Sequence, residues 1–218
     1  MNEDTDTGQA GPDAGDDQLD VHAAAAILTD ARERALRELR ASYPLLFAVW
    51  GLFFLIGYGV LWLSVRGQHP YTGPTPAALL VLILLLAAAG VTTVISAGRA
   101  FTGIGGASAA QRRVHGFALA IGVAGVFTLE GALAHVHASD SLLGVYGAVA
   151  PMLVAGVVYA ASPAIWQDWS TRTLGGWVVL VAAGSAYAGP VGVWGVAGLG
   201  AAVGFWVMAA VARRRDRA

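Results

Sequence analysis

The residues with the clearest capacity for chemistry fall in one short stretch of the chain. Glu130 follows a long apolar run, and His135, His137 and Asp140 come directly after it. A carboxyl group inside an apolar segment can bind and release a proton, which is the chemistry of proton-coupled membrane proteins. Glu130 and His137 are seven residues apart and would share one face of a continuous helix. This pair is therefore the candidate proton or ligand site.

The same residues allow other interpretations. Glu130 could be a structural carboxyl, protonated or hydrogen-bonded to a Ser, Tyr or His of a neighbouring segment. His135, His137 and Asp140 are weaker candidates for a metal site, because zinc takes such ligands. However, two residues that are two positions apart diverge on a regular helix, so a joint site requires the helix to unravel. A pH-sensitive surface is equally compatible, and no metal or other cofactor is expected.

The residue types that the chain contains do not support other catalytic chemistries. The chain has no Cys, which excludes thiol nucleophiles, disulfides and Cys-ligated metals. A haem with two axial histidines would need His residues in two different apolar segments, and only the segment containing His135 carries any. Ser185 lacks the His and acid partners that a serine hydrolase requires. Enzymes are therefore the least favoured function class.

Scarcity of charge is what makes Glu130 stand out. Hydrophobic residues make up 56% of the 218 residues and charged residues 12%, whereas a soluble globular protein carries about 25% charged residues. The segment from Ala41 to Ala212 holds only five Arg and three acids. A water-soluble fold is excluded for this segment, and the predicted fold class is all-α, a polytopic membrane helix bundle.

Apolar stretches predict six transmembrane helices in Tyr43–Ala212. A helix needs about 20 mostly apolar residues to cross a bilayer core of about 30 Å. Within this region, the final forty residues, Thr173–Ala212, carry no charge and are too long for one crossing. Gly189 and Pro190 lie near their middle, and Gly often ends a helix while Pro begins one. The predicted spans are Tyr43–Val65, Pro76–Gly98, Val114–Val136, Leu142–Ser162, Thr173–Gly189 and Val191–Ala212.

The distribution of arginine predicts the orientation. With six spans and a cytoplasmic N-terminus, twelve of the 13 Arg lie on the cytoplasmic side and only Arg66 lies outside. This asymmetry follows the positive-inside rule, so both termini are predicted to be cytoplasmic, in a bacterial plasma membrane. The longest cytoplasmic connection is predicted to be a flexible loop, Arg99–Arg113. Trp62, Tyr71, Tyr146 and Trp194 are predicted to join an interfacial aromatic belt at the outer boundary.

The two ends of the chain differ in charge. Met1–Asp20 carries seven acids and no basic residue, and it is predicted to be a disordered acidic tail. Val21–Ala41 has apolar residues at helical spacing and four Arg, so it is predicted to be a cytoplasmic amphipathic helix on the lipid surface. The alternative is a helix that binds a protein partner. Residues 213–218 form a predicted basic cytoplasmic tail, and no nucleic-acid partner is expected.

Small residues are concentrated in the third and sixth spans. Gly200 and Gly204 form a GxxxG pair, and further glycines line the sixth span. In lipid, such residues let helix backbones approach closely. Packing inside the bundle is the favoured interpretation, and a homo-oligomer formed through these small-residue helix faces is the alternative.

Short motifs carry a resemblance to a family of membrane proteins. They are Trp50-Gly51, Gly57-Tyr58-Gly59, AIWQD at Ala164–Asp168, and Gly176-Trp177. Over Leu28–Ala212 the chain resembles small six-span membrane proteins of GC-rich bacteria that are loosely labelled transporter or permease. The resemblance implies no particular substrate and no catalytic residue.

These observations lead to one favoured function and one alternative from a different class. The favoured hypothesis is a small transporter or permease-like component in which Glu130 is the proton-coupling residue. The alternative is a non-transporting membrane scaffold or regulatory partner that acts through the N-terminal segment.

Overall fold

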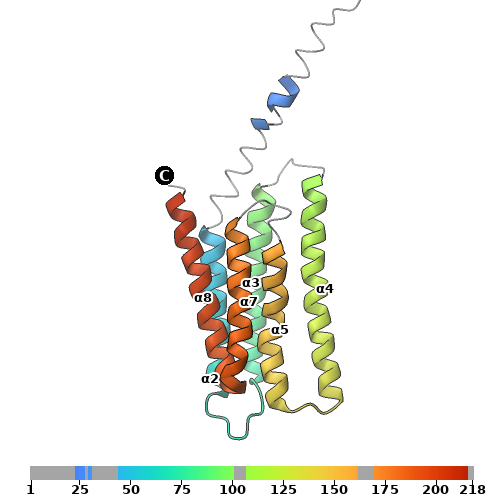
Figure 1. Ribbon diagram of the computed structural model, residues 1–218, viewed down its shortest axis with the longest axis vertical. Coiled ribbons are helices and arrows are strands. Elements are labelled where there is room, and N and C mark those ends of the chain that lie inside the picture. Colours follow the sequence, from blue (N-terminus) through green and yellow to red (C-terminus); the bar gives the residue numbers. More distant parts are fainter. Residues whose placement is uncertain (1–22, 28, 31–43, 101–106, 162–168, 216–218) are drawn as a thin grey trace, which may run out of the picture.

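The protein is a bundle of long helices that stand side by side (Figure 1). The computed structural model describes residues 23–27, 29–30, 44–100, 107–161 and 169–215. Within these residues all regular secondary structure is helical, so the predicted all-α fold class is confirmed. The first span is Pro44–Val65 and contains the π-helix η1 (Phe54–Tyr58) and α2 (Gly59–Val65). The other long helices are α3 (Pro76–Ala100), α4 (Ala107–His135), α5 (Asp140–Ala161), α7 (Trp169–Ser185) and α8 (Gly189–Arg215).

The last two helices form the predicted hairpin. Hydropathy alone joins Thr171–Arg214 into one apolar stretch of 44 residues. A 3-10 turn, η2 (Ala186–Ala188), and Gly189 with φ 72° reverse the chain before Pro190 begins the next helix. The Trp177 indole N–H then donates to the Gly200 carbonyl at 2.8 Å. The hairpin predicted at Gly189 and Pro190 is confirmed, and five to six of the described helices are long and apolar enough to cross a membrane.

Helix α8 packs closely against other helices on two sides, because its glycines have no side chains to keep these helices apart. On one side, a Cβ built on Gly198 would lie 2.5 Å from the Tyr58 Cβ of the first span. On the other side, a Cβ on Gly200 would lie 2.7 Å from the Val181 side chain of α7. The GxxxG pair is therefore used inside the bundle, as predicted. The apolar core follows α8 and its neighbours, with Leu61, Val178, Val193, Ala197, Ala201 and Phe205 all buried.

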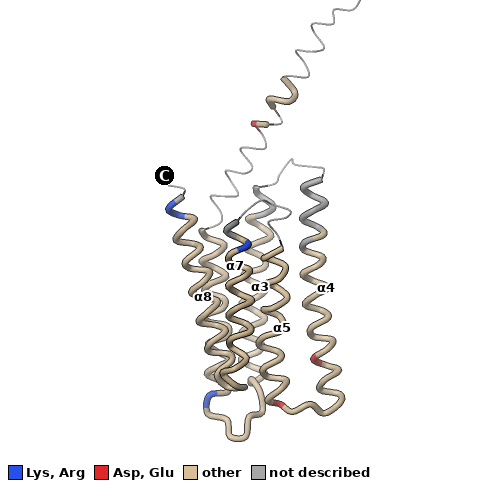
Figure 2. The backbone as a smooth tube through the Cα atoms, in the orientation of Figure 1, with Lys and Arg blue, Asp and Glu red and all other residues tan. Residues whose placement is uncertain are grey.

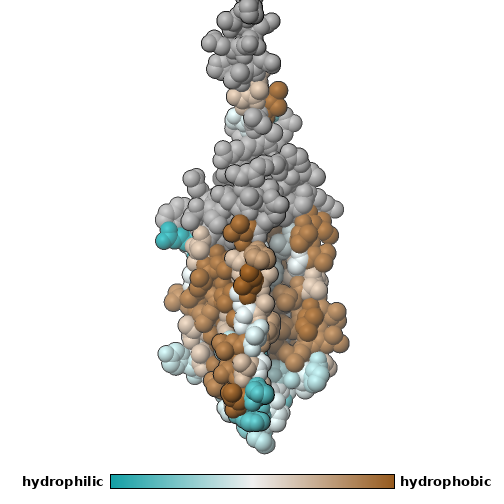
Figure 3. Space-filling view, turned by 90° about the vertical axis from the view of Figure 1, so that its right-hand side faces the viewer, coloured by the Kyte–Doolittle hydropathy of each residue, from teal (hydrophilic) through white to brown (hydrophobic). Residues whose placement is uncertain are grey.

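Helices α3 and α4 lie at the periphery. Helix α3 packs against the first span, and α4 packs against α5. Val126 is the single buried residue among the side chains of α4 that the structure describes. Phe117, Ile121 and Phe127 on the same helix are 68%, 57% and 56% exposed. Apolar residues cover most of the face in Figure 3, and hydrophilic residues gather toward its lower end. An apolar surface of this extent, on helices long enough to cross a bilayer, fits a membrane protein.

Charged residues mark the two ends of the bundle (Figure 2). The described basic residues Arg172, Arg213 and Arg214 lie where α7 begins and α8 ends. This end is called the basic end below. Arg66 follows α2 and Asp140 opens α5, at the opposite end. Pro44 and the last turn of α8 lie at the same end of the bundle, as the six-span prediction requires (Figure 1).

Two predicted boundaries differ from the structure. The predicted loop Arg99–Arg113 is helical up to Ala100 and again from Ala107, so only residues 101–106 lie outside the described helices. The segment that follows these residues is rich in Ala, Gln and Arg, which are good helix formers and extend α4 beyond its apolar run. The predicted basic tail begins as helix, because α8 continues to Arg215.

The N-terminal predictions fall mostly outside the described residues. Of the predicted helix Val21–Ala41, the structure describes residues 23–27, 29 and 30, and all of them are helical. The Thr29 hydroxyl donates to the Ala25 carbonyl at 2.8 Å, as expected within a helix. The predicted acidic tail, Met1–Asp20, and residues 216–218 lie outside the described part of the chain.

Candidate functional site

Glu130 lies where α4 meets α5. Its carboxyl group occupies the space that a side chain at Gly147 would fill, with Oε1 2.9 Å from a Cβ built there. The side chain is half-buried, and it makes no hydrogen bond or ion pair with any described residue. The absence of a side chain at Gly147 therefore lets an acid from the neighbouring helix lie at the helix interface rather than in lipid.

Pro151 adds a polar group to this contact. It lies inside α5 and has no N–H, so the Gly147 carbonyl does not receive the usual hydrogen bond from four residues ahead. A protonated carboxyl group is a hydrogen-bond donor, and a helix carbonyl without its partner is an acceptor. Helix α5 therefore provides at Gly147 both the space for the Glu130 carboxyl and a carbonyl that lacks its usual helix partner.

The turn after α4 has a defined capping motif. His137 has φ 60°, and its N–H donates to the Ala134 carbonyl at 3.0 Å. The Ala138 N–H donates to the Leu133 carbonyl, also at 3.0 Å. This pair of bonds around a left-handed residue is a Schellman motif, which ends a helix. His137 occupies the position that glycine usually takes, so its backbone conformation is strained.

This turn removes the geometric basis for the predicted pairing of Glu130 with His137. A separation of seven residues places two side chains on one face only if the helix continues, and α4 ends at His135. The chain has already reversed at His137, which is exposed. The helix-face argument for the pair therefore does not hold, and the pairing of Glu130 with His137 stays a prediction.

His135 and Asp140, two of the weaker candidates for metal ligands, each have a local structural role at the end of a helix. His135 lies in the last turn of α4, where a basic side chain suits the negative end of the helix dipole. Asp140 lies in the first turn of α5, the corresponding place for an acid. Between them, the Ser139 hydroxyl accepts the Leu142 N–H at 3.3 Å and caps α5. No three His, Cys, Asp or Glu side chains of the described residues come together as metal ligands.

The Schellman motif makes a stability prediction. His137→Gly is expected to raise stability by up to about 1 kcal/mol, because glycine adopts a positive φ without strain. His135→Gly is the matched control and is expected to lower stability by less than about 0.5 kcal/mol, because His135 is the last residue of the helix and has a negative φ that any residue adopts. Thermal unfolding in detergent measures both. If the two variants shift the melting temperature equally, the turn does not have this geometry.

An aromatic cluster lies on the other side of α5, and the sequence prediction missed it. The Tyr58 hydroxyl donates to the Ala148 carbonyl at 3.2 Å. The Trp194 indole N–H donates to the Tyr71 hydroxyl at 3.3 Å, and the Tyr58 and Trp194 ring centroids are 5.8 Å apart. Tyr71 packs against Gly144 of α5. The cluster thus joins the first span, the first loop, α5 and α8.

This cluster corrects one part of the predicted aromatic belt. Trp194 is only 5% exposed, so it faces the bundle core instead of the lipid interface. Burial raises the pKa of the Tyr71 hydroxyl above its ordinary value, and Asp140 adds to this rise, while the hydrogen bond from Trp194 opposes it. Tyr71 is therefore neutral at physiological pH. The only sequence signal for the cluster was Gly144, whose missing side chain makes room for the Tyr71 ring.

Comparison with known proteins adds no assignment. No protein-family model, curated protein or solved structure matches this chain. The resemblance to small six-span transporter-like proteins therefore stays a prediction. The candidate site depends on the chemistry of Glu130 and its contacts alone.

Proposed function

We propose that this protein is a small transporter or permease-like component in which Glu130 binds and releases a proton. The observation that supports the proposal most directly is the position of the Glu130 carboxyl against Gly147, without a partner among the described residues. A charged carboxylate at such a depth costs about 2–3 kcal/mol on insertion scales. Uptake of a proton removes this cost, and release of the proton restores it.

The packing of α4 gives this proton a mechanical consequence. Helix α4 is held mainly by α5, and the side chains of its membrane segment are mostly exposed. The protonated carboxyl can stay at the interface and donate to the backbone at Gly147. The ionised carboxylate favours water or a cation, which draws α4 away from α5. Proton binding therefore biases the position of α4 without unpacking the core around α8.

We also propose that the chain resides in a bacterial plasma membrane with both termini in the cytoplasm. The support is the predominance of Arg at the basic end, where the first span begins and α8 ends. In this orientation, Glu130 lies nearer to the outer face, because it precedes the end of α4 by only five residues.

Glu130→Gln tests the proton-binding role. The variant keeps the shape of the side chain but cannot ionise, so pH-driven solute flux in proteoliposomes is expected to fall at least tenfold. The pH-dependent carboxyl band in the infrared difference spectrum is expected to disappear as well. Asp140→Asn is the matched control, because Asp140 is an acid outside the apolar part of the helices, and it should leave flux intact. A Glu130→Gln variant with unchanged flux and an unchanged infrared band would contradict the proposal.

A further inference from the structure

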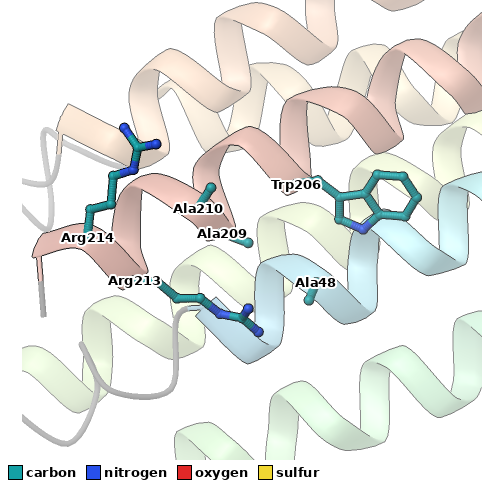
Figure 4. A pocket seen from close by; sticks show the side chains of 6 residues that line it. All are labelled: Ala48, Trp206, Ala209, Ala210, Arg213 and Arg214. Carbon is teal, nitrogen blue, oxygen red and sulfur yellow. The ribbon is translucent and has the colours of Figure 1, made fainter. Parts of the chain in front are cut away.

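A cavity opens at the basic end, between the last turns of α8 and the start of the first span (Figure 4). Its volume is about 400 Å³. Neither the function proposed for Glu130 nor the core packing uses it. The residues that line it are Ala48, Trp206, Ala209, Ala210, Arg213 and Arg214.

Small and aromatic residues shape the apolar part of this cavity. Ala48, Ala209 and Ala210 leave a shallow channel between the two helices. The Trp206 indole forms one wall, because it packs over Gly51 of the first span, and it is 39% exposed. Tryptophan with one buried and one exposed side is typical of the boundary between lipid tails and headgroups.

Two arginines form the polar end of the cavity. Figure 4 shows Arg213 reaching toward the first span, while Arg214 projects from another side of α8. Both side chains are exposed, and neither has an ion-pair partner among the described residues. Guanidinium groups bind phosphate with paired hydrogen bonds, so this end of the cavity is suited to a phosphate group.

We propose that this cavity binds one anionic phospholipid. Its phosphate lies against Arg213, Arg214 adds positive charge at the same end, and an acyl chain follows the channel past Ala210 and the Trp206 ring. The order of the lining residues matches a phospholipid, since the charged end lies at the membrane boundary and the apolar channel lies toward the bilayer core. Basic pockets between helices are a general way to hold anionic headgroups.

Native mass spectrometry of the full chain tests the proposal. Protein released from micelles with phosphatidylglycerol is expected to retain one lipid, at least fivefold more often than with phosphatidylcholine. The double variant Arg213→Gln/Arg214→Gln is expected to lose this preference. Arg66→Gln is the matched control, because it removes a charge at the opposite end, and it should retain the lipid as the unmodified chain does.

A second variant separates lipid binding from a general effect of charge. Ala210→Phe keeps both arginines but fills the channel, so it is also expected to lose the bound lipid. Inorganic phosphate at millimolar concentration should not displace the lipid. The proposal is overturned if both lipids are retained equally, if the arginine variant retains phosphatidylglycerol undiminished, or if phosphate alone occupies the site.

Discussion

Replacing Gly175 by alanine is expected to destabilise the bundle by about 2–3 kcal/mol, and replacing it by valine is expected to prevent assembly. Gly175 lies where α7 crosses α5. A Cβ at this position would overlap the backbone nitrogen of Ala160 and lie 2.7 Å from the Gly156 carbonyl oxygen. These are backbone atoms, which cannot rotate away as a flexible side chain can. The two helices would have to separate along their whole contact.

Gly176 provides the control for this prediction. It is the next residue of the same helix, and a Cβ there meets nothing within 4 Å. Both substitutions bring the same gain in helix propensity, up to about 1 kcal/mol, so the difference between the variants isolates the steric effect. Circular dichroism during unfolding in mixed micelles measures both. Equal stabilities of Gly175→Ala and Gly176→Ala would show that α5 and α7 do not cross here.

The same contact shows where prediction from sequence reached its limit. Hydropathy, together with Gly189 and Pro190, was sufficient to predict six crossings and the final hairpin. The GxxxG pair was visible because both glycines lie in one helix. Gly156 and Gly175 face each other from two helices, and spacing along the chain gives the face of a residue but not its partner.

The candidate site, too, could be predicted only in part from the sequence. Glu130 could be identified because it is an isolated acid within an apolar run. Its contact at Gly147 could not be identified, because it depends on the rotation of α5 against α4. The expectation that α4 continues to His137 was wrong because a Schellman motif does not require glycine, so the sequence carried no clear stop signal at that point. The buried Trp194 was assigned to lipid because burial is a property of the assembled bundle.

These contacts divide the bundle into a tight part and a loose part. Helices α5, α7, α8 and the first span meet through glycine contacts and aromatic hydrogen bonds. Helix α4 has one principal neighbour, and Glu130, which lies away from the helix ends, is in that interface. Such an arrangement suits a coupling element, because α4 can shift while the tight part keeps its shape.

The orientation of α4 can be tested by single cysteines at its two ends. The chain has no native Cys, and the 29 residues of α4 extend about 44 Å, enough to cross the bilayer. Val136→Cys is expected to react with a membrane-impermeant maleimide in intact cells. Ser108→Cys is expected to react only after the membrane is opened.

The choice of Val136 follows from the turn geometry. Its side chain is 69% exposed, whereas the nearby Ser139 caps α5 and is better left in place. The expected difference in labelling is nearly complete, since a bilayer either separates the reagent from the thiol or does not. The reverse pattern would place the basic end outside, and with it the cavity at Arg213. Reaction of both cysteines in intact cells would mean that α4 does not cross the membrane, and the coupling role of Glu130 would fail with it.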